Sequence, residues 1–159
     1  MLTRKLQALV YAIYSLCDNS KYIEHIRSEV RDVNSRHKGG TLKSMHFLDA
    51  FLRESARLNP IDARKSQFPF LPQYPKLMVI VSVQRKVVLP FKLPSGAHIP
   101  TGNLIAVPQH AMMRNDEIYT HASDFNPFRF LPSPENSRRS QYTDVNSAYP
   151  YWGSPKKPW

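Results

Sequence analysis

The amino-acid sequence predicts an α+β fold that is mainly helical, in a single domain covering residues 1–159. Apolar residues recur at helical spacing in three stretches before Pro60, and from Val81 onward the spacing changes to the alternation of a strand. A helix-rich section followed by a strand-rich section is typical of α+β proteins. In order, the sequence predicts three helices at 1–60, an irregular insertion at 61–80, short strands at 81–110, and a meander with a loop tail at 111–159.

Two amphipathic helices are expected at residues 3–17 and 20–36. The first carries an apolar stripe at helical spacing, formed by Leu2, Leu6, Leu9, Val10, Ile13, Leu16 and Cys17. Because Cys17 belongs to this stripe, we expect it to be a small core residue and not a nucleophile. The second helix has a buried stripe of Tyr22, Ile26, Val30 and Val33, with Glu24, Arg27, Glu29 and Arg31 expected to face water.

The third helix is expected at residues 42–58, and it holds the most informative pair of charged residues. Its apolar stripe consists of Met45, Leu48, Phe51, Leu52 and Ala56. Glu54 and Arg57 are three residues apart, so they project from neighbouring positions on the helix. Pro60 ends the helix, because the residue before a proline is disfavoured in helical conformation. Taken alone, such a pair is also what a solvated surface salt bridge looks like.

Proline and glycine divide the second half of the chain into short elements. Residues 61–80 hold three prolines within seven residues, which predicts an irregular insertion and not a fourth helix. A strand is expected from Val81, followed by turns at 94–96 and 101–102 and a second strand at 103–107. A short helix is expected near 111–113, and the tail from Leu131 is expected to be irregular.

Composition excludes several classes of function. The chain has 22 basic and 12 acidic residues and a formal net charge of +10, but the basic residues are scattered, so nucleic-acid binding is not favoured and an acidic protein partner stays open. No stretch is long and apolar enough for a membrane span, and the N-terminus lacks a signal-peptide pattern. The six histidines show no metal-ligand spacing, and a single cysteine indicates a reducing compartment.

Four motifs, taken in order, resemble the C-terminal half of a cytochrome P450 of fungal type. They are ESAR at 54–57, VSVQRKV at 81–87, IPTGNLIAVP at 99–108 and FNPFRF at 125–130. Each motif is weak alone, and their common order makes the resemblance specific. It implies a partial cytochrome P450 fold: the end of the oxygen-binding helix, the helix after it, the Glu-x-x-Arg helix, a small β-sheet and the meander.

The resemblance also implies roles for four residues. Glu54, Arg57 and Arg129 would form the buried charged triad of the family, in which one carboxylate is shared by two guanidinium groups. Its role would be structural, holding the third helix against the meander and so fixing the haem pocket. Arg85 matches the position that contacts a haem propionate, although an exposed strand arginine remains the alternative. No residue of the chain is assigned a catalytic role.

The chain departs from the family at the loop expected to hold the axial cysteine thiolate. The matching stretch is WGSPKKPW at 152–159, and Trp159 stands where the cysteine is expected. Tryptophan offers only an indole N–H and no lone pair suited to iron. We therefore expect no metal ligand, no haem bound by this chain and no turnover, as in a truncated or mis-predicted gene product. Residues 61–80 fit a translated intron or a true loop insertion.

By resemblance, the intact enzyme would be a haem-thiolate monooxygenase that inserts one oxygen atom of O2 into a small, lipophilic organic substrate. Its electrons would come from NADPH-cytochrome reductase, at the endoplasmic reticulum membrane. The chain itself, with no anchor or signal, is expected to be cytoplasmic and marginally stable, because its apolar faces lack partners. The alternatives are a non-enzymatic remnant and a basic interaction module.

Overall fold

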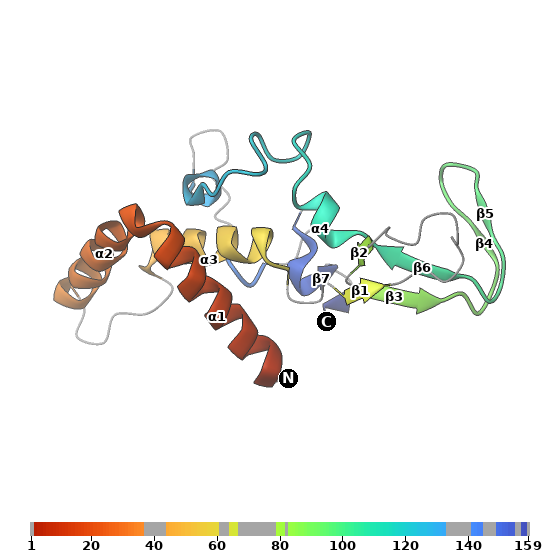
Figure 1. The fold of residues 1–159 in the computed structure, drawn as a ribbon, viewed down its shortest axis with the longest axis horizontal. Coiled ribbons are helices and arrows are strands. Elements are labelled where there is room, and N and C mark those ends of the chain that lie inside the picture. The colour runs from red at the N-terminus through yellow and green to blue at the C-terminus, as the bar shows by residue number, and fades with distance from the viewer. Residues whose placement is uncertain are drawn as a thin grey trace.

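The computed structural model describes residues 2–36, 44–60, 64–66, 79–81, 83–132, 141–144, 149–154 and 157–158. The chain begins with α1 (Leu2–Asp18), a 3-10 turn η1 (Ser20–Tyr22), α2 (Ile23–Arg36) and α3 (His46–Leu58). These three helices lie together in one part of an elongated molecule, and the strands extend away from them (Figure 1). Mixed helices and small antiparallel sheets therefore agree with the α+β class expected from the sequence.

The strands of the described residues form four separate antiparallel pairs. They are β1 (Arg64–Ser66) with β2 (Val79–Val81), β3 (Val83–Lys86) with β6 (Leu104–Val107), β4 (Phe91–Lys92) with β5 (His98–Ile99), and β7 (Gly153–Ser154) with β8 (Lys157–Pro158). The two predicted turns contain Gly96 and Gly102, which have φ of 91° and 92°. Such left-handed backbone favours glycine because it has no Cβ.

Three short elements complete the described fold. They are α4 (Gln109–Met112) and two 3-10 turns, η3 (Pro127–Phe130) and η4 (Pro150–Trp152). Within 61–80, where irregular chain was expected, the described residues pair as β1 and the start of β2. The β-branched run of β2 explains the difference, since such residues fit a pleated strand. Likewise β7 and β8 lie in the tail that was expected to be irregular.

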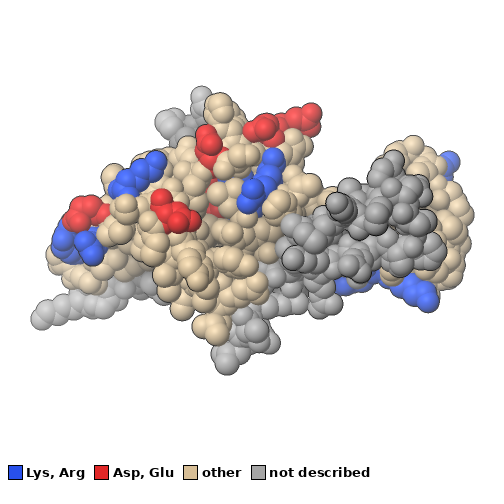
Figure 2. Space-filling model, viewed as in Figure 1, with Lys and Arg blue, Asp and Glu red and all other residues tan. Residues whose placement is uncertain are grey.

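Charge is divided unevenly between the two parts of the molecule. No aspartate or glutamate occurs from residue 63 to residue 115, which includes most of the strands. On the face shown in Figure 2, acidic side chains appear over the helical part, and only basic ones appear at the strand end. The strand section therefore carries an excess of positive charge that simple counting over the whole chain hides.

The core lies on either side of α3. One aromatic cluster contains Tyr22, Phe47 and Phe51, with Leu16, Ile26, Phe125 and Leu131 packed against it. The other contains Ala56, Met113, Tyr149 and Tyr151, with Phe130 and Tyr142 packed against it. Because helices and loops from both ends of the chain pack on α3, three of its charged residues, Arg53, Glu54 and Arg57, are buried together with much of its apolar surface.

The apolar stripe of α1 is largely exposed, which differs from the core position that the sequence predicted. Exposed fractions are 61% for Leu6, 56% for Leu9 and 54% for Ile13. Cys17 is also exposed, so its predicted place in the core is wrong. The residues that α1 buries are small, and Ser15 Oγ lies 2.8 Å from Ser55 Oγ of α3. Small side chains let two helices approach closely, so α3 packs on the face of α1 that carries Ser15. The neighbouring face of α1, which carries the apolar stripe, stays exposed.

Glu29 of α2 was expected to face water, but the structure places its carboxylate against the start of α3. Its carboxylate is partly buried and accepts the backbone N–H groups of Phe47 at 2.7 Å and Leu48 at 2.9 Å. The first N–H groups of a helix have no partner within that helix, and a carboxylate there is favourable. Glu29 thus caps α3, which starts at His46 and not at residue 42.

Candidate functional site

Glu54 is the centre of a buried cluster of charges. Its Oε2 accepts a hydrogen bond from Arg57 Nε at 2.7 Å, and its Oε1 accepts one from Arg57 Nη2 at 2.8 Å. Oε1 also accepts from the Asn126 backbone N–H at 2.8 Å and from Arg129 Nε at 3.1 Å. The side chains of Glu54 and Arg57 are 0% exposed and that of Arg129 is 12% exposed. One carboxylate therefore joins two guanidinium groups whose positions differ by 72 residues in the sequence.

Arg57 connects α3 to the loop that follows α4. Besides its two bonds to Glu54, its Nη1 donates to the carbonyls of Met113 and Ala122, both at 2.6 Å. Its Nη2 donates to the Asp124 carbonyl at 3.2 Å. A guanidinium has five N–H donors, and all five are used here. This complete set of bonds makes the burial of the charge tolerable, since a buried charge needs both a counter-charge and hydrogen-bond partners.

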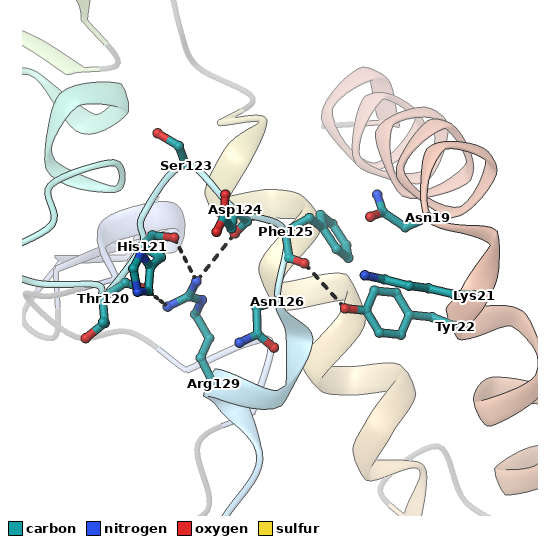
Figure 3. Close-up of a pocket in the computed structure, with 10 residues that line it drawn as sticks. All are labelled: Asn19, Lys21, Tyr22, Thr120, His121, Ser123, Asp124, Phe125, Asn126 and Arg129. Atoms are coloured by element: carbon teal, nitrogen blue, oxygen red, sulfur yellow. Dashed lines mark hydrogen bonds between the residues drawn. The ribbon is translucent and has the colours of Figure 1, made fainter.

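Arg129 is presented by η3, and its local sequence explains why. The Asn126 side chain accepts the Phe128 N–H, and Pro127 follows at the first position of the turn. Arg129 Nη1 then donates to the Thr120 carbonyl at 2.9 Å, and Nη2 donates to the His121 carbonyl at 3.2 Å. Figure 3 shows the guanidinium of Arg129 directed at this loop, and the loop in turn depends on the left-handed backbone of His121, with φ of 52°.

A polar cleft of about 880 Å³ lies between η1 and this loop. Its lining residues are Asn19, Lys21, Tyr22, Thr120, His121, Ser123, Asp124, Phe125, Asn126 and Arg129 (Figure 3). The Tyr22 hydroxyl donates to the Phe125 carbonyl at 3.4 Å, and Lys21 Nζ lies 5.0 Å from the centre of the Tyr22 ring. The hydrogen bond from Tyr22 thus links η1 to the chain just before η3, which indicates that these lining residues have a structural role.

Arg85 lies apart from the Glu54 cluster. It is an exposed residue of β3, paired in register with Ile105 of β6. In Figure 1, β3 extends toward the end of the molecule opposite α2. The structure therefore brings three of the four predicted site residues together and leaves Arg85 on a separate, positively charged element.

The two positions relevant to an iron ligand, 159 and the single cysteine, do not belong to this cluster. Trp159, at the expected cysteine position, lies outside the described residues. Cys17 is exposed on α1. Among the described ranges, no group of three or more histidine, cysteine, aspartate and glutamate side chains is arranged to hold a metal ion. No helix in the described part of the chain is long and apolar enough to cross a membrane.

Arg53 is a site residue that the sequence analysis missed. Its guanidinium carbon lies 4.6 Å from the centre of the Phe130 ring and 4.7 Å from that of Tyr149. Burial lowers the pKa of Arg53, while the nearby Tyr149 and Asp144 partly offset this effect. Spacing alone did not distinguish Arg53 from an exposed residue, because the charged residues of α3 at 49, 53, 54 and 57 fit on a single side of the helix.

Comparison with known proteins gives a consistent family match. The family model described as Cytochrome P450 matches residues 76–143. The chain is 33% identical over 132 residues to Cytochrome P450 monooxygenase ATR3 of Stachybotrys chlorohalonatus, covering 80% of this chain and 24% of that protein. It is 30% identical over 138 residues to an Ent-kaurene oxidase of Gibberella intermedia, covering 84% and 23%. It is 32% identical over 150 residues to Cytochrome P450 monooxygenase olcJ of Penicillium canescens, covering 89% and 25%. The chain thus spans about a quarter of the length of these curated relatives.

Proposed function

Because the chain belongs to the cytochrome P450 family, we propose that it is a segment of a haem-thiolate monooxygenase in which α3 and η3 support the haem pocket. The observation that carries this proposal is the sharing of the Glu54 carboxylate between Arg57 and Arg129. The ion pair between Glu54 and Arg129 joins α3 to a turn 75 positions away. Such a buried, fully hydrogen-bonded group resists small movements, because breaking it leaves an uncompensated charge.

The complete enzyme, in this proposal, oxidises a small, lipophilic organic substrate with O2. When haem is bound, its thiolate ligand donates electron density that favours cleavage of the O–O bond. Electrons would come from NADPH-cytochrome reductase, and the site of action would be the endoplasmic reticulum membrane. The fungal monooxygenases among the relatives support this reaction class.

The residues of this chain do not fit a thiolate-bound haem. The single cysteine, Cys17, is exposed on α1, and the 152–159 stretch holds tryptophan where the ligand is expected. An indole has no lone pair for iron. Arg85, on a strand section that lacks acidic residues, is suited by charge to an anionic propionate, but it cannot replace an axial ligand. We therefore propose that these 159 residues, by themselves, form no thiolate-ligated haem centre and have no turnover.

A chimera tests the proposal. This chain would replace the matching segment of the Stachybotrys relative up to the residue before Trp152, so that the relative supplies its own remaining loop. After the haem is reduced with dithionite and carbon monoxide is added, the chimera is expected to show the Soret band of thiolate-bound haem, and the isolated chain is expected not to show it.

The matched controls are Glu54→Gln, which should abolish the band of the chimera, and Glu24→Gln, which should leave it. A folded chimera without haem would contradict the proposed supporting role. A thiolate band from the isolated chain would contradict the proposed lack of a ligand.

A further inference from the structure

A second row of α3 side chains faces the C-terminal segment, defined here as residues 141–144 and 149–154. The row contains Asp49, Arg53 and Ala56, spaced four and three residues apart, so they lie on one side of the helix. Both carboxylate oxygens of Asp49 lie 3.0 Å from the Tyr142 backbone nitrogen, which donates to them. Ala56 packs in a cluster with Tyr149 and Tyr151. This row lies next to the part of the helix surface that carries Glu54 and Arg57.

Arg53 is the centre of this second row. Its guanidinium carbon lies 4.6 Å from the centre of the Phe130 ring and 4.7 Å from that of Tyr149, and these two rings contact each other edge to face with centres 5.8 Å apart. The residue is 3% exposed. The Tyr149 hydroxyl donates back to the Arg53 carbonyl at 3.2 Å. A planar, delocalised guanidinium is broad enough to contact two neighbouring aromatic rings, which a compact lysine ammonium cannot do with the same geometry.

The two rings come from separate parts of the chain. Phe130 ends η3, directly after Arg129, and Tyr149 begins the segment that leads to η4. Adjacent residues of α3 therefore hold adjacent residues of η3: Glu54 binds Arg129, and Arg53 contacts Phe130. Arg53 extends this attachment to Tyr149, which is 1% exposed and also packs against Phe130.

Other contacts keep the same segment in place. Gln109 Nε2 donates to the Pro150 carbonyl at 2.9 Å, and the rings of Tyr149 and Tyr151 stack with centres 5.9 Å apart. The segment is thus held from α3 and from α4. Within this segment, residues 149–151 are followed directly by Trp152, the first residue of the loop in which the family's iron ligand is expected.

We infer that Arg53 is a positioning residue that fixes residues 149–151 on α3 through its cation–π contacts with Phe130 and Tyr149, and so sets where the following loop begins. The attachment itself rests only on the contacts above. The statement that the loop is the haem-ligand loop rests on the proposed function.

Limited proteolysis of the whole chain with chymotrypsin tests the attachment. Tyr151 is buried, and Tyr14 on α1 is 64% exposed, so cleavage after each reports on a different part of the protein. Arg53→Met should speed cleavage after Tyr151 about tenfold and leave cleavage after Tyr14 unchanged, because loss of a buried cation–π contact favours local opening. Arg53→Lys should not restore protection, and Tyr149→Phe, which keeps the ring, should cleave nearly as slowly as the original chain.

A combined variant decides whether Arg53 and Tyr149 act together. If they do, Tyr149→Leu added to Arg53→Met speeds cleavage little beyond either change alone. Independent, multiplying effects would overturn the inference, as would full protection in Arg53→Lys. Equal acceleration at Tyr14 and Tyr151 would also overturn it, since that result indicates global unfolding.

The chimera described above separates this inference from the proposed function. There, Arg53→Met should retain haem but lower the thiolate-type Soret band several-fold, with no rescue by Arg53→Lys. An unchanged band in Arg53→Met would overturn the effect on the ligand loop. A chimera with the original Arg53 that gives no such band would instead contradict the proposed function, and the proteolysis result would stand on its own.

Discussion

Replacing Glu54 by glutamine removes one negative charge from a cluster whose other members stay positive. Glu54 and Arg57 are fully buried, and Arg129 is 12% exposed, so water cannot screen the charges left behind. Arg57 would keep its carbonyl acceptors but lose its counter-charge. Breaking a buried ion pair in this way costs about 3–5 kcal/mol. Since domains of this kind have a free energy of unfolding of about 5–15 kcal/mol, the loss is a large part of the total.

Urea unfolding followed by circular dichroism measures this loss. With a denaturant slope of about 2 kcal/mol per molar, the midpoint of Glu54→Gln should fall by about 2 M. Glu24→Gln is the matched control, because Glu24 also pairs with arginines, Arg27 and Arg31, but its side chain is 66% exposed. The control should show no resolvable change, since exposed pairs are screened. An unchanged midpoint in Glu54→Gln, or equal shifts in both variants, would refute the reasoning.

Three further predictions follow from other contacts. Ser55→Ala leaves the buried Ser15 hydroxyl without its partner and should cost about 1–3 kcal/mol, whereas alanine at both positions should be nearly neutral in the same urea assay. Glu29→Ala removes the cap of α3 and should cost about 1 kcal/mol, with reduced helical signal near its start; an unchanged signal would argue against capping. Burial raises the pKa of Tyr149 well above its usual range. The unfolded state therefore loses this proton first, so stability should be full below about pH 10 and fall as the pH rises further; Tyr149→Phe should make that fall less steep in unfolding measured against pH.

The local elements of this protein were predictable because short-range spacing determines them. Apolar residues every three or four positions predicted α1, α2 and α3 within a few residues of their observed bounds, and Gly96 and Gly102 predicted two turns. The Glu-x-x-Arg spacing placed Glu54 and Arg57 side by side, since helical geometry alone brings those positions together. The resemblance to a family, and not the spacing, named Arg129 as the third member.

Only the tertiary structure decided which of these side chains are buried and what covers them. The apolar stripe of α1 is exposed and its small face is covered, because α3 approaches where Ser15 permits close contact. Arg53 is buried against two aromatic rings that come from positions far along the chain. Periodicity records the geometry of one element at a time, so the sequence by itself determined the helices, the turns and the Glu54–Arg57 pair. Contacts between distant elements depend on how complete surfaces pack, and the structure alone decided the role of Arg53, the cap by Glu29 and the exposure of Cys17.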